Sequence, residues 1–183
     1  MYRLTLSEIF ACKLDSEAYN FFAQYPRMIN WWITRGRETV QEFKDFNAFR
    51  NKFYSEWKTD WKSYNSQHAQ TSCMFAFKTL NSNMPKNSEM KQSFVIISPV
   101  LAKIEENKTF VFTTLQTKKA RVNLVSKTSA QSVLLEQALN KYWQIGQVLL
   151  TPNWCVIPFT REIDLTQEKD PCIQTLQKEC KVF

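Results

Sequence analysis

The chain has 183 residues, 44% hydrophobic and 14% aromatic, which suits one compact domain or two small ones and excludes a largely disordered chain. Its net charge of +7 is unevenly spread: residues 78–127 carry nine basic and three acidic side chains, whereas residues 128–183 carry five and six. A local excess of this kind favours a polyanionic partner such as nucleic acid, with a solvated basic face that aids solubility as the alternative.

Residue usage excludes several kinds of site. The only two glycines, Gly36 and Gly146, are far apart, so a glycine-rich phosphate loop is excluded. Five cysteines without a C-x-x-C motif, and a single histidine, argue against a zinc site and predict reduced thiols. We expect no metal and no cofactor. No signal peptide and no apolar run of 18 residues is found, so we expect no membrane span and a cytoplasmic location.

The first half of the chain predicts one strand and three helices. Residues 2–9 alternate as a strand, and Asp15-Ser16-Glu17 is typical of a helix start. Pro26 is expected to restart or kink the helix that follows. Residues 41–59 are the clearest helix, and we interpret its apolar stripe mainly as core; the stripe consists of Phe46, Phe49, Phe53 and Trp57.

The third helix is predicted at 66–80, with His68 as a surface or interface side chain. A polar linker at 81–93 then leads into a strand-rich region. The elements expected there are a strand at 94–98, a hairpin at 101–114 turning at Glu106-Asn107-Lys108, a strand at 120–126, a helix at 129–143, and a hairpin of 145–151 with 154–165. Pro158 indicates an edge or a bulge in the last strand.

This order of elements predicts an α+β fold, in which a first strand separated from its sheet indicates three helices inserted into a small β-barrel. A catalytic centre is not expected. A two-metal nuclease needs clustered carboxylates, and His68 has no partners typical of a nucleophilic site. The chain has five aspartates without such clustering: Asp15, Asp45, Asp60, Asp164 and Asp170.

Binding of nucleic acid is better supported than catalysis. Basic residues gather at the start of the 120–126 strand and at the end of the first helical region, where Arg35 and Arg37 lie. Aromatic and basic residues alternate through 43–64, where the rings either stack on bases or, more simply, form core. The stretch 103–127 is expected to supply most phosphate contacts, through Lys103, Lys108, Lys118, Lys119, Arg121 and Lys127.

The order of these parts resembles the N-terminal half of TnpB, the transposon-encoded RNA-guided DNA nuclease, and of its relatives, the type V CRISPR effectors. Three stretches carry the resemblance: PRMINWW at 26–32, SYNSQHAQTSCMFAFKTL at 63–80 and IGQVLLTPNWCVIPFTREIDL at 145–165. In that family an OB-like wedge barrel begins with one strand, a helical recognition domain follows, and the barrel then resumes. The resemblance implies a wedge domain at 1–14 and 83–183, and a recognition domain at 15–82.

The resemblance also implies partners and site residues. The basic stretch 103–127 would face a structured guide RNA, and Tyr64 and Gln67, with Ser98 on the barrel, would contact a short motif beside the DNA target. A glutamine amide can match the N7 and N6 groups of adenine. The alternative is that Gln67 helps to cap its helix and Tyr64 packs against Trp61. The family often has a lysine where Ser63 stands.

The RuvC-like nuclease of that family has no counterpart, because the chain stops at Lys181-Val182-Phe183, where its first strand is expected. Three explanations remain open: a truncation, one piece of a split protein that works with a separate RuvC-like nuclease chain, or a repurposed binding module. The alternative function is a protein-interaction or structural factor of a mobile element or virus.

Overall fold

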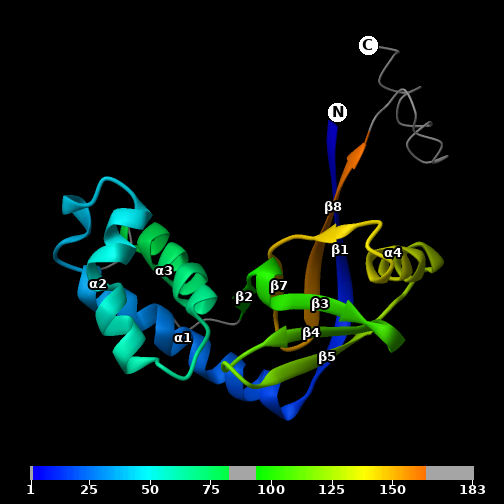
Figure 1. The fold of residues 1–183 in the computed structure, drawn as a ribbon, viewed down its shortest axis with the longest axis horizontal. Coiled ribbons are helices and arrows are strands. Elements are labelled where there is room, and N and C mark those ends of the chain that lie inside the picture. Colours follow the sequence, from blue (N-terminus) through cyan, green and yellow to red (C-terminus); the bar gives the residue numbers. More distant parts are fainter. Residues whose placement is uncertain (1, 83–93, 164–183) are drawn as a thin grey trace.

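The computed structural model describes residues 2–82 and 94–163, and it has the predicted α+β class (Figure 1). The described helices are α1 (Ser16–Gly36), α2 (Phe46–Asp60), α3 (Ser66–Leu80) and α4 (Ser129–Leu139). The described strands are β1 (Tyr2–Leu14), β2 (Val95–Ile97), β3 (Ala102–Glu105), β4 (Thr109–Thr113), β5 (Lys119–Val125), β6 (Gln144–Ile145), β7 (Val148–Leu150) and β8 (Trp154–Ile163). None of the helices in these ranges is both long and apolar enough to cross a bilayer.

All described strands belong to one antiparallel sheet in the order β2-β7-β8-β1-β5-β4-β3, with β6 paired to β8. Strand β1 is central, between β5 and β8, so α1–α3 lie in the chain between two parts of one sheet. The two end strands, β2 and β3, do not pair with each other, so the sheet is not closed as the predicted barrel requires. Only residues 98–101 separate these strands in the chain.

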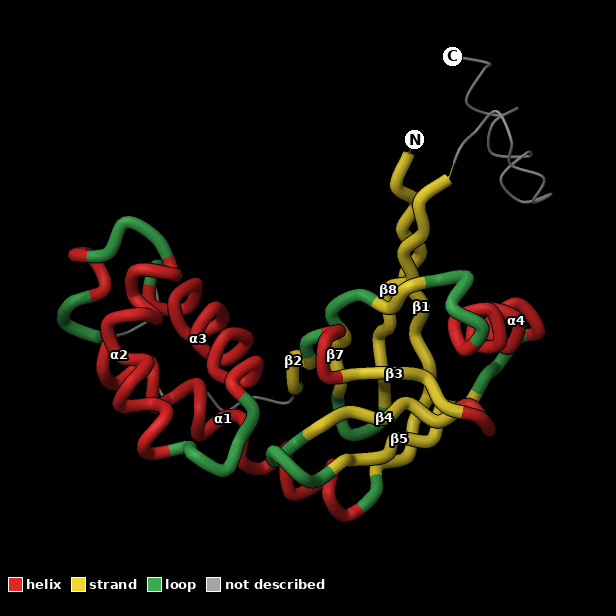
Figure 2. Tube along the Cα trace, in the orientation of Figure 1, coloured by secondary structure: helices red, strands yellow, loops and turns green. Residues whose placement is uncertain are grey.

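Strand β1 is longer than predicted, because the apolar alternation continues past residue 9. Phe10 and Cys12 are buried on the inner side, and Ile9 and Lys13 face outward. The outer ends of β1 and β8 pair with each other beyond the rest of the sheet and project as a two-stranded ribbon (Figure 2).

Helix α1 does not restart at Pro26, as was expected, but continues through it. Asp15 caps the helix, since its Oδ1 accepts the Ala18 N–H at 2.7 Å. Proline removes one backbone hydrogen bond, but the residues on either side of it, Tyr25, Met28 and Ile29, are completely buried. Packing of these side chains therefore outweighs the local penalty.

The core interpretation of the α2 stripe is confirmed for Phe49 and Trp57, which are buried. Phe46 and Phe53 are half-buried and pack against the same cluster. The helix begins later than predicted, because Asp45 caps it by accepting the Ala48 N–H at 2.9 Å. Gly36 allows close packing here, since a Cβ at this position would lie 2.6 Å from both a Phe49 ring carbon and a Leu80 methyl.

The β-rich half follows the predicted order with shorter elements. The first hairpin turns at residues 106–108, where Asn107 and Lys108 adopt positive φ angles. Helix α4 ends at Leu139, four residues early. Pro158 lies where β8 passes between its pairings with β7 and β6, and its carbonyl accepts the Gly146 N–H. The missing proline N–H therefore falls at a gap in the ladder, but β8 lies between β7 and β1 and is not an edge strand.

His68 is not a surface side chain; it is fully buried at the interface between α3 and β4. Its Nε2 lies 2.8 Å from the Thr113 carbonyl oxygen, so Nε2 carries the proton and donates. Burial lowers the pKa of His68 to about 4. The neutral ring therefore joins the helices to the sheet, and its Nδ1 has no partner among the described residues.

Candidate nucleic-acid interface

The outer face of β3–β5 gathers predicted RNA-binding residues from separate strands. Strand pairing places Lys103 beside Val111 and Val111 beside Arg121, so the two cations flank one valine across three strands. Lys119 lies two residues before Arg121 and points to the same side, because β5 alternates strictly between exposed and buried positions. Val111 is only 1% exposed although it is on the outer face, consistent with cover from these long side chains.

One carboxylate is shared by two of these cations. Glu105 accepts from Lys103 Nζ at 2.7 Å and from Arg121 at 2.8 Å. The hydrogen bond from Lys103, and then that from Arg121, lower the pKa of Glu105 below its ordinary value despite partial desolvation. The three side chains carry a net charge of +1, so Glu105 orients the cations without cancelling them.

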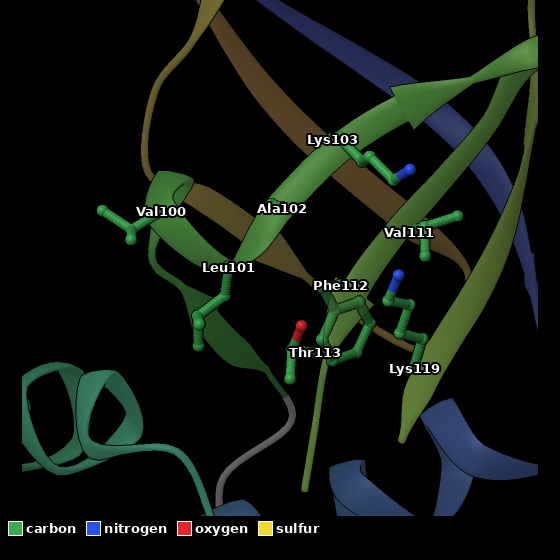
Figure 3. Close-up of a pocket in the computed structure, with 8 residues that line it drawn as sticks. All are labelled: Val100, Leu101, Ala102, Lys103, Val111, Phe112, Thr113 and Lys119. Atoms are coloured by element: carbon green, nitrogen blue, oxygen red, sulfur yellow. The ribbon is translucent and has the colours of Figure 1, made fainter. Parts of the chain in front are cut away.

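Lys119 adds charge at the other end of this face, and Lys118 lies just before β5 and is directed toward α1. Lys119 is exposed and has no ion pair within residues 2–82 and 94–163. Lys118 Nζ is 3.9 Å from Glu17, a long pair between an exposed lysine and a half-buried carboxylate. Figure 3 shows Lys103 and Lys119 extending over the same shallow pocket beside Val111. This pocket has a volume of about 210 Å³, and Val100, 76% exposed, lies at its edge.

The other predicted RNA-binding residues lie outside this face. Lys108 donates to Ser132 on α4 at 2.9 Å, and the Nζ of Lys127 lies 4.5 Å from the Trp154 ring centroid. Arg35 stacks on Trp31 at 3.6 Å, and its guanidinium forms ion pairs that tie α1 to α2. Arg37 is half-buried just after α1. The basic set is therefore divided between the sheet face, the α4 end and the helices.

Two of the three residues expected at the DNA motif are in contact. Ser98 donates from Oγ to Gln67 Oε1 at 3.3 Å, which joins the start of α3 to the segment between β2 and β3. Ser98 is buried, with 7% exposure, while Gln67 is half-buried. This hydrogen bond occupies the Gln67 carbonyl oxygen and leaves its amide NH₂ without a partner among the described residues.

The alternative reading of these residues is partly correct. Asn65, not Gln67, caps α3, since its Oδ1 accepts the Gln67 N–H at 3.0 Å. Tyr64 does pack against Trp61, with ring centroids 5.7 Å apart, and it also bridges to Leu115 in the β4–β5 turn. Burial is the main cause of a raised Tyr64 pKa.

Part of the mixed aromatic and basic stretch 43–64 lines a concave site. Of the residues predicted to bind RNA or DNA, only Tyr64 lies in this site. Its rings and lysines line a pocket of about 520 Å³ at the junction of α2, α3 and the β4–β5 turn. The three-and-four spacing of these aromatics was visible in the sequence, but it indicates burial as strongly as it indicates a binding surface.

Acidic and thiol groups do not assemble into a further site in the described ranges. No group of three or more His, Cys, Asp or Glu side chains there could hold a metal ion. Asp164 and Asp170 lie outside the described residues. Cys12, Cys73 and Cys155 are free and buried, and burial raises the pKa of Cys12 to about 11. No family model matches the chain, and no curated protein matches it significantly.

Proposed function

We propose that the chain is a non-catalytic nucleic-acid-binding module whose outer β3–β5 face contacts the phosphates of a structured RNA. The observation that carries this proposal is the cross-strand placement of Lys103, Lys119 and Arg121 on one open face. Phosphate contacts need exposed cations held at fixed separations, and strand pairing provides that spacing. Glu105 keeps the Arg121 guanidinium extended along the face.

A finer version of the proposal follows the resemblance to TnpB-like proteins. Its support is topological: β1 precedes the three helices and pairs with strands that follow them. The edge strands β2 and β3 are separated by only four residues, which favours a sheet curled into a partly open barrel like a wedge domain. In this version the sheet binds guide RNA, and the start of α3 reads a short motif in target DNA.

The proposed motif site consists of Tyr64, Gln67 and Ser98. The Ser98 hydrogen bond would hold the Gln67 amide in one orientation, so that its NH₂ group faces an acceptor on a base. In this version the chain supplies recognition alone, and cleavage would belong to a separate RuvC-like nuclease chain.

The test of RNA binding compares two double variants with matched charge loss. Lys119→Gln with Arg121→Gln should weaken binding to co-purified RNA, and should reduce the log–log salt slope by about 0.7–0.9 per lost contact. Lys44→Gln with Lys52→Gln, on exposed positions of the helical part, should leave the slope nearly unchanged. Equal effects of the two pairs would show that binding depends on total charge and would overturn the site.

The motif site has its own test. Gln67→Ala should relax the preference among DNA motifs by about 1–3 kcal/mol at one or two positions, with the RNA affinity unchanged. Gln70→Ala, an exposed glutamine on the same helix, is the control. Both measurements use the chain with its RNA and, where a nuclease partner is found, with that partner. Loss of stability with an unchanged motif preference would assign Gln67 a structural role only.

A second candidate function, protein interaction, is favoured by one observation. Strand pairing aligns Val125, Ala11 and Trp154 across the outer face of β5, β1 and β8, and Val125 and Trp154 are 46% and 42% exposed. Exposed apolar rows of this kind are found at protein interfaces. A bound partner that survives nuclease treatment and 1 M salt would favour this function, since phosphate contacts weaken steeply with salt (about 0.7–0.9 in log–log slope per contact).

A further inference from the structure

A second concave site lies where the end of α2, the start of α3 and the β4–β5 turn meet. Its volume of about 520 Å³ falls in the range typical of ligand pockets, roughly 300–1,000 Å³. No acidic residue lines it. Its chemistry comes from four aromatic rings and two cations: Tyr54, Trp57, Trp61, Tyr64, Lys58 and Lys62.

Three of the four aromatic residues form a wall because of their spacing along α2. Tyr54, Trp57 and Trp61 follow one another at three and four residues and so share a face of α2 and its C-terminal cap. The Tyr54 and Trp57 rings are nearly parallel, at 6° with centroids 6.4 Å apart. Trp57 is 1% exposed, but Tyr54 and Trp61 are only half-buried. The wall is therefore more open than a core cluster.

The wall also carries donors that the fold does not use. The indole N–H groups of Trp57 and Trp61 are buried and have no acceptor among the described residues. Buried donors nearly always find a partner, so an unpaired one is unfavourable. Two such donors beside one pocket indicate that a ligand with acceptor atoms would improve their hydrogen bonding once the side chains adjust to it.

The charges at the pocket favour an anion. Lys58 and Lys62 are exposed, and neither has an ion pair within residues 2–82 and 94–163. Asn65 and Ser66, at the N-terminus of α3, line the same pocket, and the positive end of a helix dipole attracts anions. Stacking faces and an anion site thus lie together.

The pocket is held in shape by the β4–β5 turn. Gln116 donates its backbone N–H to the Ser63 carbonyl at 3.0 Å and its side-chain amide to the Lys62 carbonyl at 2.9 Å. The Tyr64–Leu115 bridge adds a further tie. Such ties reduce the ordering needed when a ligand binds.

We propose that this pocket binds an unpaired nucleotide of a single-stranded segment, with its base against the Trp61 and Tyr54 rings and its phosphate at Lys58 and Lys62. The inference rests on the proposed nucleic-acid function and adds to it a preference for an unstacked base. Aromatic platforms beside cations are the usual means of binding single strands without strong sequence preference.

The test measures the affinity of the full chain for labelled ten-nucleotide single strands, as RNA and as DNA. Each strand is compared with the same strand carrying abasic sites, and with a blunt duplex. Trp61→Ala should weaken binding of the intact single strand by about 5- to 150-fold, the equivalent of roughly 1–3 kcal/mol per stacked base. The same variant should bind the abasic strand as the parent protein does, because no base remains to stack. The stronger of the RNA and DNA arms identifies the source of the nucleotide.

Conservative and charge-matched variants distinguish a loss of binding from a folding defect. Trp61→Phe keeps a ring and should stay within about threefold of the parent affinity, since stacking tolerates any aromatic face. Lys58→Gln with Lys62→Gln should reduce the salt slope by about 0.7 per contact, and Lys44→Gln with Lys52→Gln should not. Far-ultraviolet circular dichroism and a melting curve establish that each variant is folded.

The outcomes separate this inference from the proposed function. One outcome is that Lys119→Gln with Arg121→Gln abolishes binding of structured RNA, while the Trp61 and Lys58/Lys62 variants bind single strands as the parent does. This result would overturn the pocket assignment and support the sheet face. Equal affinity for intact and abasic strands also overturns the pocket. If no strand or structured RNA binds to the parent protein, both proposals fall together.

Discussion

The cations predicted to bind RNA are used differently in the helical and sheet parts of this protein. In α1–α3 the aromatic rings pack on each other, as around Phe49. The Arg35 guanidinium forms ion pairs with two carboxylates and stacks on a tryptophan. On the β3–β5 face, two cations share one carboxylate and Lys119 has no ion pair in the described part of the chain. A basic residue in the sequence is therefore not equivalent to an available charge.

The largest effect should come from the aromatic core of the helical part. Phe49→Ala removes a completely buried ring that packs against Trp32, Phe43, Phe53 and Phe77. We expect the free energy of unfolding to fall by about 3–5 kcal/mol in urea denaturation. Tyr19→Ala, at a 54% exposed position of α1, should change it by less than about 0.5 kcal/mol. A loss below about 1 kcal/mol for Phe49→Ala would contradict a tightly packed helical core.

The contact between the two parts should depend on pH. The folded-state pKa of His68 is lowered to about 4, below the ordinary 6.5, so the unfolded chain binds a proton more readily than the folded one. Stability from this group is complete above pH 6.5 and is lost as pH falls from 6.5 to 4, by up to about 3 kcal/mol.

His68→Gln provides the control for this pH dependence, because His68 is the only histidine and glutamine does not titrate. The variant is compared with the parent protein by urea denaturation at half-unit steps from pH 7.5 to 4. The difference between the two stability curves should change with pH only in this interval. A constant difference would mean that the ring is not protected from protonation.

A smaller effect should follow from crowding the helical part. In Gly36→Ala the new methyl group would be placed 2.6 Å from Phe49 and from Leu80. Such overpacking typically costs about 1–3 kcal/mol. Gly146→Ala, where the nearest atom would be 3.1 Å away, should cost less in the same thermal denaturation series. The reverse order would show that the helices can separate more easily than the sheet can adjust.

The smallest effect on stability should come from the sheet face. Lys119→Gln and Arg121→Gln alter exposed side chains, so each should change the free energy of unfolding by less than about 0.5 kcal/mol, even if nucleic-acid binding is reduced. Urea denaturation checks this expectation. A loss above 1 kcal/mol would mean that the Glu105 ion pairs are structural and that the face differs less from the helical part than its exposure indicates.

The sequence predicted those features that depend on local pattern. The bounds of α3 agree with the prediction, because Asn65 supplies a strong local cap and the apolar face is periodic. The expected restart of the helix at Pro26 was wrong, because the burial of Tyr25, Met28 and Ile29 is a tertiary effect. The burial of His68 was also hidden, since nothing local indicates that α3 packs between the other helices and the sheet.

In the candidate site, too, local sequence pattern predicts some features and tertiary structure decides the others. The basic stretch 103–127 was evident from charge alone, but strand register decides that Lys103, Lys119 and Arg121 share a face while Lys108 and Lys127 do not. The Gln67–Ser98 hydrogen bond joins residues 31 apart in the chain, and no local pattern predicts it.

The pairing of β1 with β8 has a consequence for how the chain folds. Ala11 pairs with Trp154, so the longest ladder of the sheet closes only after nearly the whole described chain has been made. Ladders between such distant segments form slowly, whereas the contacts within α1–α3 are much closer in sequence. At synthesis rates of about 5–20 residues per second, β8 is synthesised on the order of ten seconds after β1. During that interval the helical part can already fold. The backbone groups of β1 that later pair with β8 are still unpaired, and a chaperone would protect this strand.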